Sequence, residues 1–141
     1  MKYRRKKIWL NTRKTKYCIV KLYDHKKEMQ CAYKEFTRDR KSSKVKGASC
    51  HYSKLTYRPY KLSPEVGTVF LCREYCGAAI VAHEFMHAVM WAYRHTRYKK
   101  QYPFVIKSMR EEEVLLHNHS YAVMQFYVWY WKLNKQSNGM A

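Results

Sequence analysis

The sequence predicts an α+β fold in which a small antiparallel sheet is followed by two helices. The first half of the chain carries short runs of β-branched and aromatic residues, separated by polar or proline-containing stretches. After Gly77 the apolar residues recur at helical spacing. The chain has 141 residues, of which 47% are hydrophobic, and it contains no internal repeat or Gly/Ser-rich linker. We therefore expect one domain that spans residues 1–141.

The strands are expected in the first half of the chain. Tyr17–Tyr23 and Glu28–Phe36 flank the polar segment Asp24–Lys27, which predicts a β-hairpin. Ser49–Tyr57 is a further candidate strand. Two prolines then break the chain before Gly67–Cys72, where a β-branched and aromatic run predicts another strand.

Two helices are expected after these strands. Ala78–Tyr93 is rich in Ala, Met, Val and Trp and contains no Gly or Pro, as is typical of a helix. Ser108 is a candidate N-cap for the second helix, and the acids Glu111–Glu113 suit the positive end of a helix dipole. This helix should continue to about Lys132, and the tail Asn134–Ala141 should fray.

The chain is strongly basic, with 29 Lys and Arg against 10 Asp and Glu and a formal charge of +19. Such an excess favours attraction to polyanions or to acidic protein surfaces. The basic residues cluster at Lys2–Lys7, Arg38–Lys46 and Arg94–Lys100. We interpret these clusters as solvated faces ahead of a dedicated phosphate-binding groove, and a nucleic-acid partner stays open as an alternative.

Several features favour a cytoplasmic protein with no membrane contact. The basic N-terminal segment lacks the apolar stretch of a signal peptide, and no apolar run is long enough to cross a bilayer. The five cysteines are an odd number, which suits reduced thiols in a cytoplasm. The composition leaves the oligomeric state open.

The segment His83–His87 has the pattern His-Glu-x-x-His inside the first predicted helix. Two His four residues apart on a helix point the same way, so both imidazoles can reach one ion. Neutral imidazole suits Zn²⁺, and a catalytic zinc site has three protein ligands with one position left for water. Glu84 would lie beside that water, where it can take a proton and pass it to a leaving amine. The pattern predicts a zinc-dependent metallopeptidase with a protein or peptide substrate; the alternative is a pair of core histidines with Glu84 as their counter-charge.

The third zinc ligand decides the class of peptidase. A metzincin has Gly and His at the positions that Met90 and Tyr93 occupy, so that class is excluded. His95 would point about 80° away from His87 on a straight helix. The remaining candidates all lie in the second helix: Glu111, Glu112, Glu113, His117 and His119.

Helical phase favours Glu112 among these candidates, because it continues the apolar stripe of the second helix through Leu115, His119 and Phe126. A group that stabilises the oxyanion is harder to select from the sequence. Tyr93, Tyr121 and His117 are candidates.

Three segments, Gly67–Leu71, Gly77–Ala88 and Glu112–Leu116, together resemble the small predicted metallopeptidases of phages and mobile elements. They are more distantly similar to the ImmA/IrrE-like gluzincins. The resemblance covers roughly the second half of the chain and is sharpest at the His-Glu-x-x-His pattern. It implies a minimal zincin-like fold with Glu113 as the third ligand, and Leu116 stands where those families commonly have Ala.

The resemblance leads us to place Glu113 first as the third ligand and Glu112 second. It also implies that the strand Thr68–Cys72 is a sheet edge to which an extended substrate could add. The second functional hypothesis is a basic nucleic-acid-binding or inhibitory module in which the zinc is structural.

Overall fold

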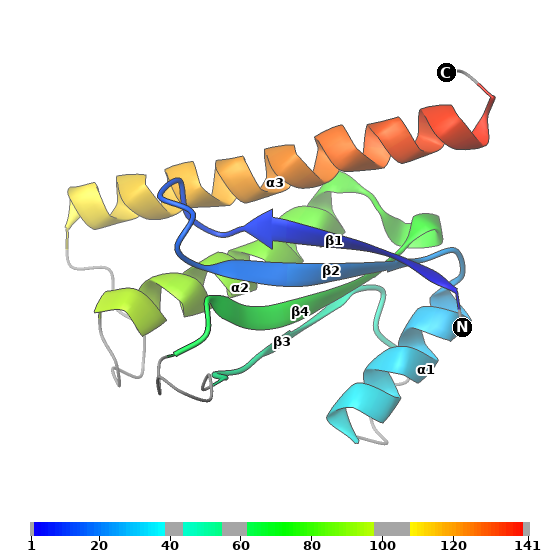
Figure 1. Ribbon diagram of the computed structural model, residues 1–141, viewed down its shortest axis with the longest axis horizontal. Helices are drawn as coiled ribbons and strands as arrows, with labels where there is room; N and C mark the ends of the chain where they lie inside the picture. Colours follow the sequence, from blue (N-terminus) through cyan, green and yellow to red (C-terminus); the bar gives the residue numbers. More distant parts are fainter. Residues whose placement is uncertain (1, 39–43, 55–61, 98–107, 140–141) are drawn as a thin grey trace.

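The structure is a computed structural model that describes residues 2–38, 44–54, 62–97 and 108–139. For residues 95–97 it describes the backbone alone. Figure 1 shows a small sheet with helices on both faces. The elements in chain order are β1 (Tyr3–Trp9), β2 (Tyr17–Tyr23), α1 (Lys26–Thr37), β3 (Ala48–His51), β4 (Glu65–Cys72), the 3₁₀ turn η1 (Arg73–Tyr75), α2 (Ala78–Arg97) and α3 (Met109–Ser137).

The predicted α+β class is confirmed, but the sheet is mixed rather than purely antiparallel. Its strands lie in the order β1-β2-β4-β3. β1 pairs antiparallel with β2, and β3 pairs antiparallel with β4. β2 and β4 are parallel, because α1 and β3 lie between them in the chain and return it to the same end of the sheet. β4 is therefore an inner strand and β3 is an edge strand.

The predicted hairpin is wrong, since Glu28–Phe36 belongs to helix α1. Within this segment Met29 is fully buried, and Ala32 and Tyr33 pack with it against Phe70. That three- and four-residue spacing is helical. The basic segment Tyr3–Trp9, in which we predicted no strand, forms β1.

The other predicted elements are present, with some differences in their bounds. Gly67–Cys72 lies within β4. Of the candidate strand Ser49–Tyr57, residues 49–51 lie in β3, residues 52–54 are not in a strand, and residues 55–57 fall outside the described residues. Ser108 caps α3 by accepting a hydrogen bond from the backbone N–H of Glu111 at 3.2 Å. The helix then runs to Ser137, beyond the expected end.

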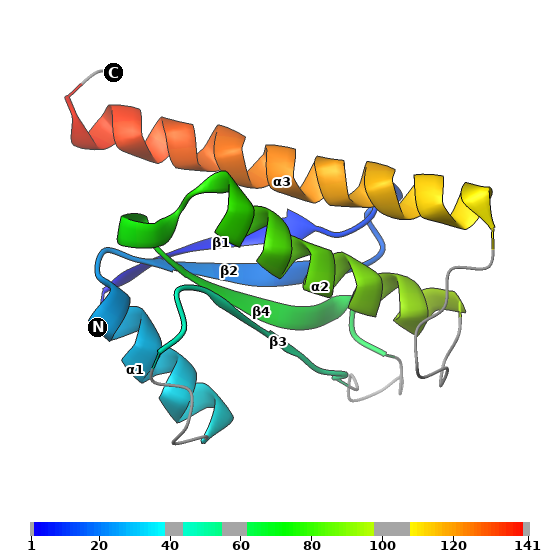
Figure 2. The same ribbon diagram turned by 180° about the vertical axis from the view of Figure 1, so that it is seen from behind.

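Helices α2 and α3 cover one face of the sheet, as Figure 2 shows. The main core lies between them and the strands, and its largest fully buried members include Ile8, Leu22, Leu71, Phe85 and Phe126. Helix α1 packs on the opposite face in a smaller cluster that contains Tyr23, Met29 and Phe70. The sheet is thus fully covered on one side and covered only in part on the other.

Helix α3 is attached to the sheet and to α2 by specific hydrogen bonds. The Gln125 amide accepts from the Trp9 backbone N–H at 3.0 Å and donates to the Trp9 carbonyl at 2.9 Å. α3 runs antiparallel to α2 (Figure 1), and Nε2 of His119 lies 2.9 Å from the Ala82 carbonyl oxygen. In the part of the chain that the structure describes, no helix combines the length and the apolar character that crossing a membrane requires.

Candidate metal centre

The two histidines of the His-Glu-x-x-His pattern come together on the solvent face of α2. Both side chains are exposed, and their Nε2 atoms lie 3.1 Å apart. The rings are nearly perpendicular, with centroids 4.6 Å apart. The helix thus brings both imidazoles to one point, as the four-residue spacing predicted.

The geometry of this pair fits two ligands of a tetrahedral zinc ion. Two Zn–N bonds of about 2.0–2.1 Å at the tetrahedral angle place their nitrogens about 3.3 Å apart. The separation between His83 and His87 is within a few tenths of an ångström of that value. Both nitrogens are the outer ones of their rings, so small rotations of the side chains suffice to accept an ion. The donor set therefore suits Zn²⁺.

Glu84 lies on the side of α2 that faces the edge strand β3. Only 8% of this residue is exposed. A Cβ atom built on Gly47, just before β3, would lie 3.4 Å from its Cγ atom. Glu84 also helps to raise the pKa of the Cys50 thiol, after burial, while a hydrogen bond from Tyr33 lowers it. The Glu84 side chain is therefore packed against the segment that leads into β3, while the histidine pair on the same helix is exposed.

His51 is a neighbour of the pair that the sequence did not single out. It is the last residue of β3, and its ring stacks on Trp91 of α2 with centroids 5.8 Å apart and an interplanar angle of 25°. Trp91 follows His87 by one helical turn, so His51 lies on the His87 side of the helix. Both ring nitrogens of His51 are buried and have no hydrogen-bond partner among the described residues. Burial, followed by the charges of His87 and Arg94, lowers its pKa to about 4.

The predicted third ligands lie on α3, on the opposite flank of α2. Glu112 and Glu113 are both exposed, whereas Glu111 is buried. Glu113 follows Glu111 by about 200° of helical rotation, so it points away from the buried stripe of α3. Glu112 shares a side of α3 with His119, the residue that contacts Ala82. Of the two glutamates, Glu112 is the better oriented toward α2.

The remaining predicted site residues have other surroundings. His117 is exposed and Tyr121 is half-buried, both on α3. The Nε2 atom of His119 is already engaged with the Ala82 carbonyl. In the described ranges, no three His, Cys, Asp or Glu side chains lie close enough to hold one metal ion. The structure thus brings together two of the predicted ligands, His83 and His87, and none of the predicted third ligands lies close enough to share one ion with them.

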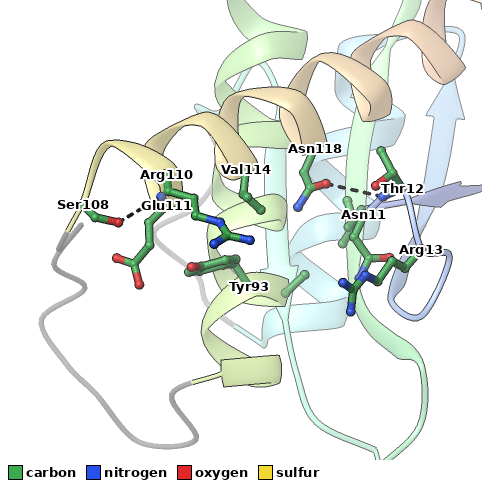
Figure 3. A pocket seen from close by; sticks show the side chains of 11 residues that line it. Asn11, Thr12, Arg13, Tyr93, Ser108, Arg110, Glu111, Val114 and Asn118 are labelled. Atoms are coloured by element: carbon green, nitrogen blue, oxygen red, sulfur yellow. Dashed lines mark hydrogen bonds between the residues drawn. The ribbon is translucent and has the colours of Figure 1, made fainter.

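A cavity of about 500 Å³ lies away from the histidine pair, where the ends of α2 and α3 meet the connection between β1 and β2. Figure 3 shows its lining, with Arg110 and Glu111 from α3, Tyr93 from α2 and Arg13 from the β1–β2 connection. Asn118 accepts a hydrogen bond there from the backbone N–H of Thr12 at 3.4 Å. None of His83, Glu84 and His87 lines this cavity. Tyr93, a candidate for stabilising the oxyanion, therefore lines this cavity, away from the histidine pair.

The structure also corrects the predicted sheet edge. The strand Thr68–Cys72, expected at the edge, lies in β4 between β2 and β3. Its residues are buried without alternation, because helices pack on both faces at this point. The free edge beside α2 belongs to β3. The signal that could have indicated this is the unbroken apolar run in β4, which is typical of an inner strand.

Comparison of the chain with protein-family models, with curated protein sequences and with solved structures gave no significant match.

Proposed function

We propose that this protein is a zinc-dependent metallopeptidase that hydrolyses protein or peptide substrates. The observation that supports this proposal is the 3.1 Å separation between the Nε2 atoms of His83 and His87 on an exposed helix face. Glu84 follows the first histidine directly and is held against the edge strand. An imidazole pair followed by a carboxylate supplies two of the three zinc ligands and the proton acceptor that metal-assisted peptide hydrolysis uses.

The proposed reaction uses the bound zinc and the Glu84 carboxylate in different roles. Zinc, when bound, acidifies a water molecule and polarises a carbonyl group. The Glu84 carboxylate accepts a proton from the attacking water at one of its oxygens and returns that proton to the leaving amine nitrogen. The burial of Glu84 limits the freedom of its side chain, which favours proton transfer from a fixed position.

For the third ligand we propose Glu112 ahead of Glu113. Glu112 shares the α2-facing side of α3 with His119, whereas Glu113 points away from the buried stripe. His51 is a further candidate after a movement of its side chain, because its ring stacks on Trp91, one turn after His87, with both nitrogens unpartnered among the described residues. In its present position it is too far from the pair to share one ion. A neutral imidazole and a carboxylate are both suitable zinc donors.

An extended substrate would bind along β3. This strand pairs on one side with β4 and is the outermost strand of the sheet, next to the α2 face that carries Glu84. An unpaired strand edge can hydrogen-bond an added strand through its backbone groups. The scissile bond of a peptide bound in this way would lie over the histidine pair.

We also propose that the protein works in the cytoplasm. All five cysteines are free, and Cys18 and Cys72 are buried thiols within the sheet. A chain that keeps five thiols without pairing them suits a reducing compartment.

The decisive experiment measures zinc content and peptide hydrolysis in matched variants. Purified wild-type protein should contain one zinc ion per chain and cleave an unstructured protein such as casein. His83→Ala and His87→Ala should lose the metal. Glu84→Gln should keep the metal and lose hydrolysis by a factor of about 10² or more, since only the proton acceptor is removed.

Variants of the acids on α3 locate the third ligand. Glu112→Ala should reduce zinc affinity strongly, and Glu113→Ala should leave it unchanged. Glu35→Ala, which removes an exposed acid of α1 on the other face of the sheet, is the matched control. The proposal fails if wild-type protein binds no zinc, or if Glu84→Gln cleaves as fast as the wild type.

A further inference from the structure

One end of the sheet carries a basic and aromatic surface on the face opposite α2 and α3. Figure 1 views this face, and α1 is the only labelled helix in front of it, near one end of the strands. α1 contacts β2 and β4 and covers the part of these strands that contains Tyr23 and Phe70. The outer part of β1 and β2 therefore has no helix over it among the described elements.

The strand register shows which side chains share this face. The core-facing partners Ile8 and Cys18 are buried against α2 and α3. The alternate pairs must face the other way, because neighbouring side chains of a strand point to opposite sides. These pairs are Tyr3 with Tyr23, Arg5 with Lys21, Lys7 with Ile19, and Trp9 with Tyr17. We call Tyr3, Arg5, Lys7, Trp9, Tyr17 and Lys21 the basic–aromatic face.

Two of the three cations of this face, Lys7 and Lys21, lie over its rings. The Lys7 ammonium is 4.2 Å from the Trp9 ring centroid and 4.3 Å from that of Tyr17. Trp9 and Tyr17 form an edge-to-face pair with centroids 5.4 Å apart. Lys21 lies 5.2 Å from the Tyr3 ring, which is itself 43% exposed. Positive charge and flat aromatic surface thus occur within one or two residue spacings of each other.

The charge of this face is not neutralised by acids of its own strands. β1 and β2 contain no Asp or Glu. The nearest described acid on β4 is Glu65, which is engaged by Lys54 and by the Tyr52 hydroxyl at 2.8 Å. Glu65 also interacts electrostatically with Arg5, and Glu28 and Glu35 of α1 act on Tyr23 at the covered end of this face. Lys7 and Lys21 still leave the face with a net positive charge. A polyanion is the complementary partner.

We propose that the basic–aromatic face binds single-stranded nucleic acid. Lysine and arginine would contact successive phosphates, and the rings of Trp9, Tyr17 and Tyr3 would stack on unpaired bases. Rings on an open sheet cannot reach the faces of bases that are stacked within a duplex, which selects for single strands. An acidic peptide would satisfy the charge but would make no use of the rings.

This surface is separate from the proposed metal centre. The histidine pair lies on α2, on the other side of the sheet, and none of its residues belongs to the basic–aromatic face. Binding should therefore be unchanged in His83→Ala and in the presence of a metal chelator. If experiments contradict the peptidase proposal, the binding proposal is unaffected. If they contradict the binding proposal, the peptidase proposal is likewise unaffected.

The test is fluorescence anisotropy with a labelled oligothymidylate, titrated at several NaCl concentrations in the presence of chelator. The wild type should bind the single strand more tightly than a duplex of the same length. Each of Arg5→Ala and Lys7→Ala should weaken binding and reduce the slope of log K against log [salt] by about 0.7 for one lost phosphate contact. Trp9→Leu should weaken binding at least about fivefold through lost stacking.

A similar cation–aromatic pair on α3 gives the matched control. Lys135 lies 3.8 Å from the ring centroid of Trp131, and both side chains are exposed. Lys135→Ala removes the same charge as Lys7→Ala and should leave affinity and salt slope near the wild-type values. Equal effects of the two variants, tighter binding of the duplex, or equal binding of polyglutamate would each overturn the proposal. Lys7 is exposed on its strand, so Lys7→Ala tests the face even if Trp9→Leu unfolds.

Discussion

His51 is the residue whose surroundings change most between the sequence and the folded chain. In the sequence it is one of seven histidines, with no motif around it. In the structure it is stacked on Trp91, and its ring nitrogens are buried. Burial is the main reason that its pKa falls to about 4, and the charges of His87 and Arg94 add to the effect. The imidazole is therefore neutral at physiological pH.

This lowered pKa predicts a specific loss of stability in acid. In the unfolded chain His51 should titrate near 6.5, so between pH 6.5 and pH 4 the unfolded state binds more protons than the folded state. Stability is then complete above about pH 6.5 and falls as the pH drops through 4. For metal-free protein the free energy of unfolding should decrease by up to about 3 kcal/mol from this group, measured by urea denaturation at successive pH values.

The control for this prediction is His51→Gln, which keeps a side chain of similar size and removes the titration. The difference in unfolding free energy between wild type and variant should change with pH across this window. A difference that stays constant from pH 7 to pH 4 would show that His51 is not held neutral by its site.

Among the elements, β3 depends on an unusually close approach to β4. A Cβ atom on Gly67 would lie 2.8 Å from the carbonyl oxygen of Cys50 and 3.1 Å from Nδ1 of His51. The first contact is with backbone, which cannot move without displacing the strand. Because Gly67 has no side chain, β3 can pack closely against β4 and place His51 beside α2. β3 thereby connects the sheet to the candidate site.

We expect Gly67→Ala to destabilise the protein by about 1–3 kcal/mol, because a backbone clash must be relieved by moving β3. Gly77→Ala is the matched control, since a Cβ atom there meets nothing within 4 Å, and its effect should stay within about 0.5 kcal/mol. Thermal unfolding of the two variants gives the comparison. Equal stabilities would mean that the two strands do not approach as closely as the structure shows.

The elements also differ in how well local sequence predicts them. α2 and α3 have long apolar stripes and, for α3, a serine cap, so their own residues specify them. α1 was misread as a strand although Glu28–Phe36 is rich in good helix formers, among them Met29, Gln30 and Ala32. β1 was missed because its residues are mostly charged, and its pairing with β2 and its two hydrogen bonds to Gln125 establish it as a strand.

For the whole molecule, the charge of +19 opposes compaction. Like charges along β1 and on the other elements repel one another over the Debye length, which falls from about 30 Å at 0.01 M salt to about 8 Å at 0.15 M. Folding concentrates these charges, so the folded state suffers more from the repulsion than the expanded chain does.

Added salt should therefore stabilise the folded protein. We expect the Tm to rise by a few degrees between about 0.01 M and 0.15 M NaCl, measured by circular dichroism. Glucose at the same osmolality, which screens no charge, should have a much smaller effect. A Tm that falls on adding NaCl would indicate that favourable ion pairs, such as Arg73 with Asp24 at 3.0 Å, outweigh the general repulsion.

The sequence by itself determined the α+β class, the two C-terminal helices and the convergence of His83 and His87. These features depend on spacings of three and four residues along one helix, which the backbone geometry converts directly into contacts. The tertiary structure alone decided that β3 is the edge strand beside α2 and that His51 and Glu84 lie on its side of α2. Such contacts join residues far apart in the chain, and their pairing depends on how the whole sheet and its helices pack together.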